Sequence, residues 1–533
     1  MKRKAASSND TTMSPSTVSS VDKWERTNLR LPAVAPRNDD SLISSATKAT
    51  SGSSLTADAS NHNHSRASHD VDYLYLPPAI DSSTSSSVAI EENHEQHRSR
   101  VTTSKQKLLQ HFKALDRHLS SIPQLTNSTR QLLVYNGGHE NVTATNSGRI
   151  INVLQGEMAH CTPNQADVLV SDDATTCHIL ALWSVSKRNS CSHLMQQQQD
   201  QSIEQKKDQG KTILATIAHI DGPGYQDCIR DAVDLHYQHH SSQHHFMSSS
   251  QAELRDDDDE DTTVTTIPDI ELYIHLMGGY NDNEGTSHEI TEGVLRALSN
   301  ISNDYANIQQ QKQLQPRLQM ILQTCAVSSS NDDGSRCPIG RGLALSVSSG
   351  QVYLAEVDEE EEDVAVVESS ASSCRENNDH ANDVAVTTSA RGPDWILRHV
   401  RLWASLLFQE DDDTNTHQHK KRKLQIIHHP TKDQLIISPF YFDSSHPFPH
   451  QMLTVFNDEM FLQYTSSSPE VEKANFVSHV RETFRFMNER SCLDAFEKKE
   501  VKEIDSGGGS WNDDDYLPRR YRRVGLNGWA AVT

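Results

Sequence analysis

The sequence predicts one α+β domain with a largely antiparallel sheet, interrupted by long disordered inserts. Apolar runs of strand length occur between segments that have the apolar spacing of amphipathic helices. Two such runs, 343–347 and 352–357, flank a Ser-Ser-Gly-Gln segment, which is typical of a β-hairpin. Only 35% of the 533 residues are hydrophobic, and Ser, Gln, Asn, Asp and His are concentrated in blocks that bury too little apolar surface to fold.

Five segments are expected to form helices because their apolar residues recur every three or four positions. The segment 287–301 places Ile290, Val294 and Leu298 on one face, and Thr286-x-x-Glu289 is a candidate capping box at its start. The predicted helices are 105–119, 227–236, 287–301, 394–408 and 470–487.

Strands are expected where apolar runs are short and are bounded by turn residues. The predicted strands are 149–154, 167–170, 179–183, 213–218, 270–277, 319–327, 342–347, 352–357 and 434–438.

A cysteine and a histidine flank two of these runs. Cys177 precedes the run 179–183, and His219 follows the run 213–218. In an antiparallel hairpin with Val185 facing Lys211, Cys177 lies directly opposite His219, with Cβ atoms roughly 4.5–5.5 Å apart. A thiol and an imidazole at this distance can share a proton, which indicates Cys–His nucleophilic catalysis. The alternative is a structural thiol in the core.

The neighbouring histidine is a weaker candidate for the base. His178 follows the cysteine directly, and successive strand residues point to opposite faces of a sheet. We therefore expect the His178 side chain to lie in the core or behind the site.

The segment 171–179 (SDDATTCHI) resembles the active-site stretch of the eukaryotic protein N-terminal asparagine amidohydrolases. Further similar segments follow in order between about residues 134 and 487, with polar insertions between them. They are Gln155, Glu157, Met158 and Ala159, then His219, Asp221 and Gly222, then 275–282 (HLMGGYND), 447–450 (PFPH) and 476–481 (FVSHVR). The resemblance implies a β-sandwich core flanked by helices, as in bacterial chemoreceptor deamidases and deamidating toxins.

The resemblance also implies a reaction without a cofactor. His219 accepts the thiol proton, and Cys177 attacks the side-chain amide of an N-terminal asparagine. Ammonia leaves, and water hydrolyses the thioester to give aspartate. Ser171 occupies the place where related deamidases carry a hydroxyl that orients the histidine, with turn capping as the alternative. The new terminus would feed an N-end degradation pathway.

Substrate binding requires donors for an oxyanion and an acid for the α-ammonium. Backbone N–H groups near Cys177, with the Thr176 hydroxyl, are the candidate donors. Asp172, Asp173 and Glu157 are the candidate acids, and we expect at least one of them to be structural. No metal site is expected, because the histidine-rich segment 236–245 has no Cys or acid at ligand spacing.

The domain is expected at 101–503, after a disordered extension at 1–100 and before a polar tail at 504–533. The predicted inserts are about 187–210, 238–266, 304–316, 358–391 and 410–423. Surface loops tolerate such lengths, since closure entropy grows only logarithmically with loop length.

Composition excludes some partners. The formal net charge is −24, with acidic runs at 256–261 and 358–363, which disfavours nucleic-acid binding. No run reaches the ~20 apolar residues of a membrane span. The eight cysteines form no Cys-x-x-Cys pair, so we expect a reducing compartment, the cytoplasm. Basic clusters at 2–4 and 420–423 would add the nucleus if either is an import signal, and solvated charge runs are the simpler interpretation.

We expect a monomer that acts on peptides or proteins with N-terminal asparagine. Two alternatives stay open from the sequence. One is a Cys-dependent deamidase of internal Asn or Gln side chains, and the other is a catalytically inactive adaptor that recruits partners through its acidic inserts.

Overall fold

The computed structural model describes 15 segments of the chain. They are 25–32, 73–77, 94–135, 140–142, 148–187, 212–222, 224–252, 269–282, 284–311, 316–357, 386–387, 391–408, 423–499, 515–525 and 528–532. The predicted inserts at 187–210 and 410–423 lie almost entirely outside these residues.

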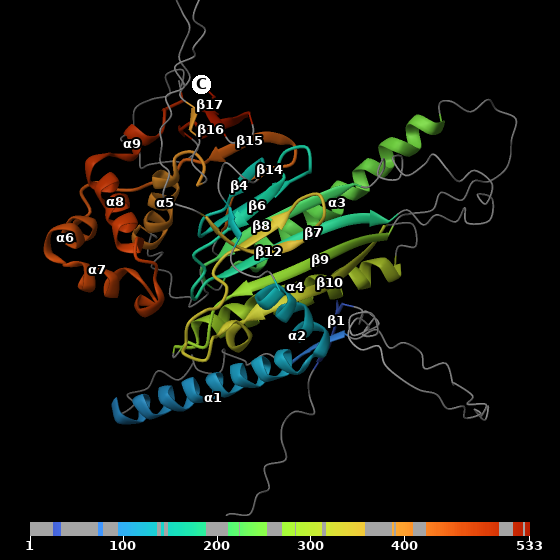
Figure 1. Ribbon diagram of the computed structural model, residues 1–533, viewed down its shortest axis with the longest axis horizontal. Helices are drawn as coiled ribbons and strands as arrows, with labels where there is room; N and C mark the ends of the chain where they lie inside the picture. Colours follow the sequence, from blue (N-terminus) through green and yellow to red (C-terminus); the bar gives the residue numbers. More distant parts are fainter. Residues whose placement is uncertain are drawn as a thin grey trace, which may run out of the picture.

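A large mixed sheet forms the centre of the molecule (Figure 1). Its strands, in spatial order, are β13 (Val386–Thr387), β17 (Gly528–Ala531), β16 (Arg519–Val524), β15 (Lys432–Ile437), β14 (Gln425–His429), β5 (Glu157–Cys161), β8 (Ile213–Ile220), β7 (His178–Lys187), β9 (Asp269–Gly278), β10 (Arg317–Val327), β1 (Glu25–Arg30) and β2 (Tyr73–Leu76). Most neighbours are antiparallel, and the pairs β9–β10, β5–β14 and β1–β10 are parallel.

A smaller sheet packs against one face of the large one. Its order is β3 (Glu140–Val142), β12 (Val352–Val357), β11 (Leu343–Ser346), β6 (Val168–Ser171) and β4 (Ile150–Asn152). Leu169 and Leu345 from this sheet share a buried core with Ala181 and Ile217 from the large sheet. The α+β class is therefore confirmed, and the predicted hairpin is the pair β11–β12.

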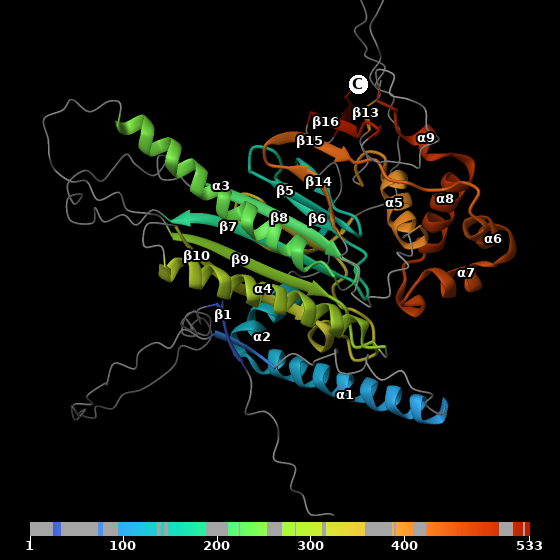
Figure 2. The same cartoon turned by 180° about the vertical axis from the view of Figure 1, so that it is seen from behind.

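Helices cover the rest of this layered core (Figures 1 and 2). The helices α1 (His94–Ser121), α2 (Pro123–Arg130), α3 (Gln226–Ala252) and α4 (Thr286–Gln311) contribute to the core on the other face of the large sheet. A second group, beside the two sheets, consists of α5 (Trp395–Leu407), α6 (Pro447–Val455), α7 (Asp458–Thr465), α8 (Phe476–Glu489) and α9 (Cys492–Ala495). Short π- and 3₁₀-helical turns occur at Gln131–Tyr135, Ser328–Asn331 and Pro469–Val471.

The alternation of strand residues explains how β7 and β8 separate the two cores. Ile179 and Ala181 belong to the core shared with the small sheet, whereas Leu180 and Leu182 belong to the core beneath α3 and α4. β7 is bordered by β8 and β9, so both of its edges are hydrogen-bonded. This coverage explains the continuous apolar run 179–183 within β7.

Several segments predicted to be disordered contain regular structure. β1 and β2 lie within the first hundred residues and extend the sheet beyond β10, with Leu29 and Leu74 fully buried. β16 and β17 lie within the predicted polar tail. The helices α3 and α4 continue through much of 238–252 and through 304–311, and β13 lies inside the predicted insert 358–391. Those parts of the disorder prediction are wrong.

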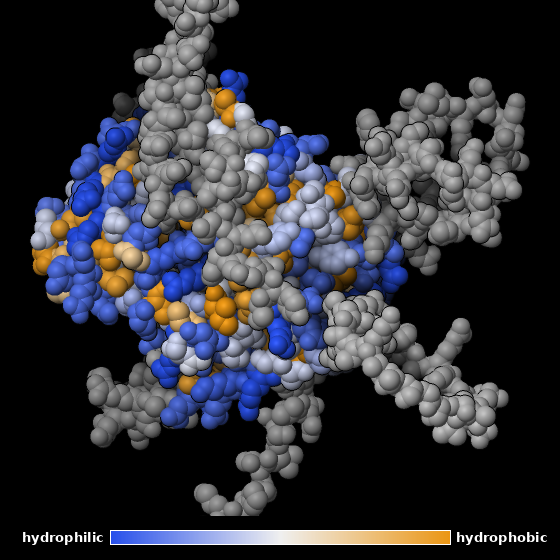
Figure 3. All heavy atoms as spheres, in the orientation of Figure 1, coloured by the Kyte–Doolittle hydropathy of each residue, from blue (hydrophilic) through white to orange (hydrophobic). Residues whose placement is uncertain are grey.

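The face drawn in Figure 3 is mainly hydrophilic where it is coloured, and its hydrophobic residues form small separate patches. Among the segments that the structure describes, no helix is both long enough and apolar enough to cross a membrane.

Candidate active site

The proposed nucleophile precedes β7, and the proposed base is on β8. The observed register pairs Ile179 with His219 and Val185 with Ile213. The predicted pairing of Cys177 with His219 is therefore wrong by two residues, and the two side chains are diagonal neighbours. They still share a face, because strand side chains alternate with a period of two. Both line one cavity of about 130 Å³.

Ser171, at the end of β6, contacts the histidine. Its Oγ donates to the carbonyl oxygen of Val153 at 2.6 Å, so the same oxygen accepts from Nδ1 of His219 at 2.9 Å. This assignment leaves Nε2 of His219 without a proton. Nε2 is buried and has no hydrogen-bond partner among the described residues. A base held in this tautomer can accept a proton from a group in the cavity.

Burial sets the resting protonation of the pair. It raises the pKa of the Cys177 thiol, and the charges of Asp221 and Glu472 raise this pKa further. Burial also lowers the pKa of His219 to about 4, against the opposing effect of Asp221 and Asp173. At neutral pH the pair is therefore a neutral thiol and a neutral imidazole. Only 8% of Cys177 is exposed, through the cavity.

Two glycines let β9 approach the nucleophile. Gly278 and Gly279 have φ values of 128° and 65°, and a Cβ on Gly278 would lie 2.3 Å from the carbonyl oxygen of Cys177. The N–H of Gly279 donates to that oxygen at 2.9 Å. The 275–282 segment thus fixes the Cys177 backbone. Asp282 then caps α4 by accepting from the amides of Thr286 and Ser287, a role predicted for Thr286 itself.

The two acids before the nucleophile form an ion cluster with a lysine. Nζ of Lys473 lies 2.6 Å from Asp173 and 3.4 Å from Asp172, and it also contacts Glu356 at 3.2 Å. Asp172 accepts from the N–H of Val357 at 3.0 Å as well. Burial and the charge of Asp173 raise the pKa of Asp172. Burial would also raise the pKa of Asp173, but Lys473 lowers it below its usual value.

Glu157 has a different partner and does not line the cavity. Its carboxylate receives two hydrogen bonds from Arg398 of α5, at 2.9 and 2.5 Å, and one from the N–H of Leu154 at 2.9 Å. Arg398 is 2% exposed and Glu157 is also 2% exposed. Because its oxygens are engaged in this buried pair, Glu157 has a structural role and is not available to bind the substrate.

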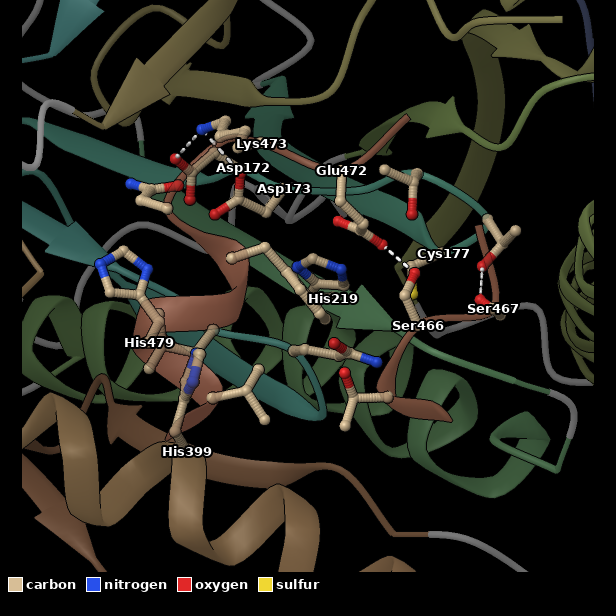
Figure 4. A pocket seen from close by; sticks show the side chains of 18 of the residues that line it. Asp172, Asp173, Cys177, His219, His399, Ser466, Ser467, Glu472, Lys473 and His479 are labelled. Carbon is tan, nitrogen blue, oxygen red and sulfur yellow. Dashed lines mark hydrogen bonds and ion pairs between the residues drawn. The ribbon is translucent and has the colours of Figure 1, made fainter. Parts of the chain in front are cut away.

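The segment 172–177 between β6 and β7 carries the nucleophile and is called the nucleophile turn. Hydroxyl groups join it to the segment between α7 and α8. Oγ of Ser468 donates to Oγ1 of Thr175 at 2.8 Å, and Thr176 and Ser467 share a hydrogen bond of 2.9 Å. Ser466 donates to Glu472, whose carboxylate lies beside Cys177 (Figure 4). This segment, 465–475, therefore forms one wall of the cavity.

The residues of this wall were not predicted from the sequence to line the site. Ser466, Ser467, Glu472, Lys473 and Asn475 line the cavity, together with Arg391 and His399 from elsewhere in the chain. In this part of the sequence, only the segment 476–481 indicated a link to the site, through its resemblance to the family. Its residues Phe476, His479 and Val480 do line the cavity. His450, in the family-like segment 447–450, is exposed on α6 and does not line the cavity.

Of the predictions for the remaining histidines, one is confirmed and one is wrong. His178 is fully buried on the other side of the sheet, where Nε2 contacts Oγ1 of Thr291 at 2.8 Å, as predicted from strand alternation. His236 and His240, predicted in or beside an insert, are fully buried and both contact Ser184. Within the described segments, no group of three His, Cys, Asp or Glu side chains is arranged to hold a metal ion.

Comparison with known proteins identifies the family of this chain. A family model described as protein N-terminal asparagine amidohydrolase matches residues 140–249, 260–380 and 378–512. The human and pig proteins named protein N-terminal asparagine amidohydrolase are each 21% identical to this chain over 347 residues. These alignments cover 63% of this chain and 74% of each relative. The family model spans more than half of the sequence, including every segment around Cys177, so the chain belongs to the protein N-terminal asparagine amidohydrolase family.

Proposed function

We propose that this enzyme hydrolyses the side-chain amide of an N-terminal asparagine to aspartate and ammonia through a Cys177 thioester. As a member of its family, the chain is a hydrolase of a linear amide bond. The observation that supports the mechanism is Nε2 of His219, which has no hydrogen-bond partner among the described residues and shares the cavity with the Cys177 thiol while Ser171 binds Nδ1.

The neutral resting pair determines the order of events. The thiol loses its proton to Nε2 of His219 as sulfur attacks the carboxamide carbon, since a free thiolate is disfavoured in this cavity. The tetrahedral oxyanion then collapses as the imidazolium gives its proton to the leaving nitrogen, which departs as ammonia. Water, deprotonated by the same imidazole, hydrolyses the thioester to the aspartate side chain and regenerates the thiol.

The nucleophile turn supplies the candidate oxyanion donors. Thr176 lines the cavity and hydrogen-bonds Ser467, so its hydroxyl and the N–H groups at Thr176 and Cys177 are placed at the start of β7. Preorganised donors of this kind contribute roughly 10²–10³-fold to the rate. In this proposal Ser171 is a positioning residue, because it acts through the imidazole.

The product has an acidic N-terminus. We propose that it enters an N-end degradation pathway after arginylation, so the enzyme supplies a substrate to a transferase. We propose that the enzyme acts in the cytoplasm, a reducing compartment in which Cys177 stays a free thiol. The reaction uses only groups of this chain and water.

The test compares three peptides with the same sequence after the first residue, starting with Asn, Gln and N-acetyl-Asn. Ammonia release and mass spectrometry give the rate and the product. We expect turnover of the Asn peptide alone. Equal turnover of the acetylated peptide would instead support an internal-Asn deamidase, and no turnover of any peptide would support the adaptor alternative.

The same assay tests the nucleophile. Cys177→Ala should abolish ammonia release and leave the unfolding transition intact, and Cys337→Ala is the matched control because Cys337 lies outside the cavity. Substantial activity in Cys177→Ala would exclude the thioester mechanism.

A further inference from the structure

A free α-ammonium is what distinguishes the proposed substrate from any internal asparagine. In an N-terminal asparagine, three bonds separate the α-nitrogen from the carboxamide carbon that sulfur attacks. Reacting atoms approach to about 3–3.5 Å before bond formation. An acid that binds the ammonium must therefore lie close to the Cys177 sulfur, and this requirement rests on the proposed function.

Only some of the nearby acids meet the requirement. The carboxylates whose charge raises the pKa of Cys177 are Asp221 and Glu472. Asp221 accepts from the hydroxyl of Tyr225 and does not line the cavity. Glu472 lines the cavity, and Figure 4 shows its carboxylate directed toward the side of Cys177.

The two aspartates of the nucleophile turn already contact a cation. Lys473 lies within 3.4 Å of both Asp172 and Asp173. Glu472 forms no ion pair with any described residue; instead it accepts a hydrogen bond from Ser466, and Oγ of Ser468, which donates to Thr175, lies 3.3 Å from the same carboxylate. The Ser466 hydroxyl orients the carboxylate, and neither serine supplies a positive charge.

The surroundings of Glu472 favour a cation. Burial raises the pKa of Glu472, and the negative charge of Asp173 raises it further, whereas the hydroxyls of Ser466 and Ser468 and the charge of Arg341 lower it. A substrate ammonium between the sulfur and this carboxylate would relieve both of the effects that raise the pKa, because an opposite charge favours the ionised form.

We propose that Glu472 binds the α-ammonium of the substrate and thereby restricts the enzyme to chain termini. Lys473, the next residue, pairs with both competing aspartates, so among the described cavity-lining acids Glu472 is the one without an ion-pair partner. The segment 465–475 thus supplies specificity, whereas the turn before β7 supplies the nucleophile.

The experiment compares an Asn peptide with its succinamoyl analogue, which has the same carboxamide but a hydrogen in place of the α-amine. In Glu472→Gln, we expect kcat/KM for the Asn peptide to fall roughly 10- to 100-fold, mainly through KM, since a hydrogen bond to a charged group is lost. The rate with the succinamoyl peptide should not fall, because this peptide has no ammonium for Glu472 to bind. Glu470→Gln is the matched control, because Glu470 is exposed and lies outside the cavity.

The outcomes separate the two proposals. If the wild-type enzyme releases no ammonia from the Asn peptide, the proposed function fails. If the wild type prefers the free amine and Glu472→Gln keeps the same preference, only the role of Glu472 fails. Should the variant not fold, the wild type gives a second measurement. Its preference for the amine should decline above pH about 8, where the α-amine deprotonates, and a constant preference up to pH about 9.5 would overturn the inference.

Discussion

Replacing Gly278 by alanine tests whether the end of β9 fixes the nucleophile. The added Cβ would lie 2.3 Å from the Cys177 carbonyl oxygen, and ordinary contact begins at 3.4 Å, so the backbones must separate by about 1.1 Å (3.4 − 2.3). Overpacking of this kind costs ~1–3 kcal/mol. The φ of 128° adds backbone strain of ~1–3 kcal/mol for a residue with a side chain. We expect the free energy of unfolding to fall by ~2–6 kcal/mol.

The same displacement should reduce activity. A misplacement of about 1 Å at reacting groups costs on the order of 10²-fold in rate. The measurements are urea unfolding and ammonia release from an Asn peptide. Gly525→Ala is the control, because Gly525 also has a positive φ, 65°, but nothing lies within 4 Å of its added Cβ. If Gly278→Ala matched Gly525→Ala in both assays, the close approach would have no role in placing the sulfur.

Three further predictions concern protonation and orientation. Ser171→Ala should lower kcat roughly 10- to 100-fold with little change in KM, because the His219 imidazole loses its partner at Nδ1; an unchanged kcat would refute the orienting role. Stability should decrease from pH 7 to pH 5, because the unfolded imidazoles of His160 and His178 gain protons below about pH 6.5 while burial lowers their folded pKa values to about 3. Each contributes up to about 2 kcal/mol, and equal urea midpoints at both pH values would contradict this. Iodoacetamide should label Cys177 more slowly than a free cysteine peptide at pH 7.5, and rapid labelling at pH 6 would indicate a thiolate–imidazolium pair instead.

The catalytic face was predictable because it depends on local pattern. The apolar runs of β7 and β8 place Cys177 and His219 on one face in the predicted register and also in the observed one. The two registers differ by two residues, and a shift of two leaves every side chain on its original face. Hydrophobic pattern therefore cannot distinguish them. The observed register is also compatible with the pairing of β7 with β9 and of β8 with β5. The prediction considered β7 and β8 alone and could not include these neighbours.

The edge strands were not predictable from composition. β1 and β2 are six and four residues long within polar sequence. They are ordered because the free edge of β10 offers backbone hydrogen bonds and because Leu29 and Leu74 enter a core built by distant helices. A short polar segment gains this stabilisation only from the rest of the fold. The same explanation applies to β16, whose Arg-rich sequence pairs with β15.

The wall at 465–475 joins the site through contacts that span nearly 300 residues of sequence, such as Ser468 to Thr175. Its chemistry changes how the cysteine must be activated. The charge of Glu472 contributes to the raised pKa of Cys177, so the acid proposed to recognise the substrate also helps to keep the nucleophile protonated. An arriving ammonium would neutralise that charge and lower the pKa of the thiol at the moment when its proton must pass to His219. Iodoacetamide should therefore label Cys177 faster in Glu472→Gln than in the wild type. An equal rate in the two proteins would mean that substrate recognition and thiol activation are independent in this enzyme.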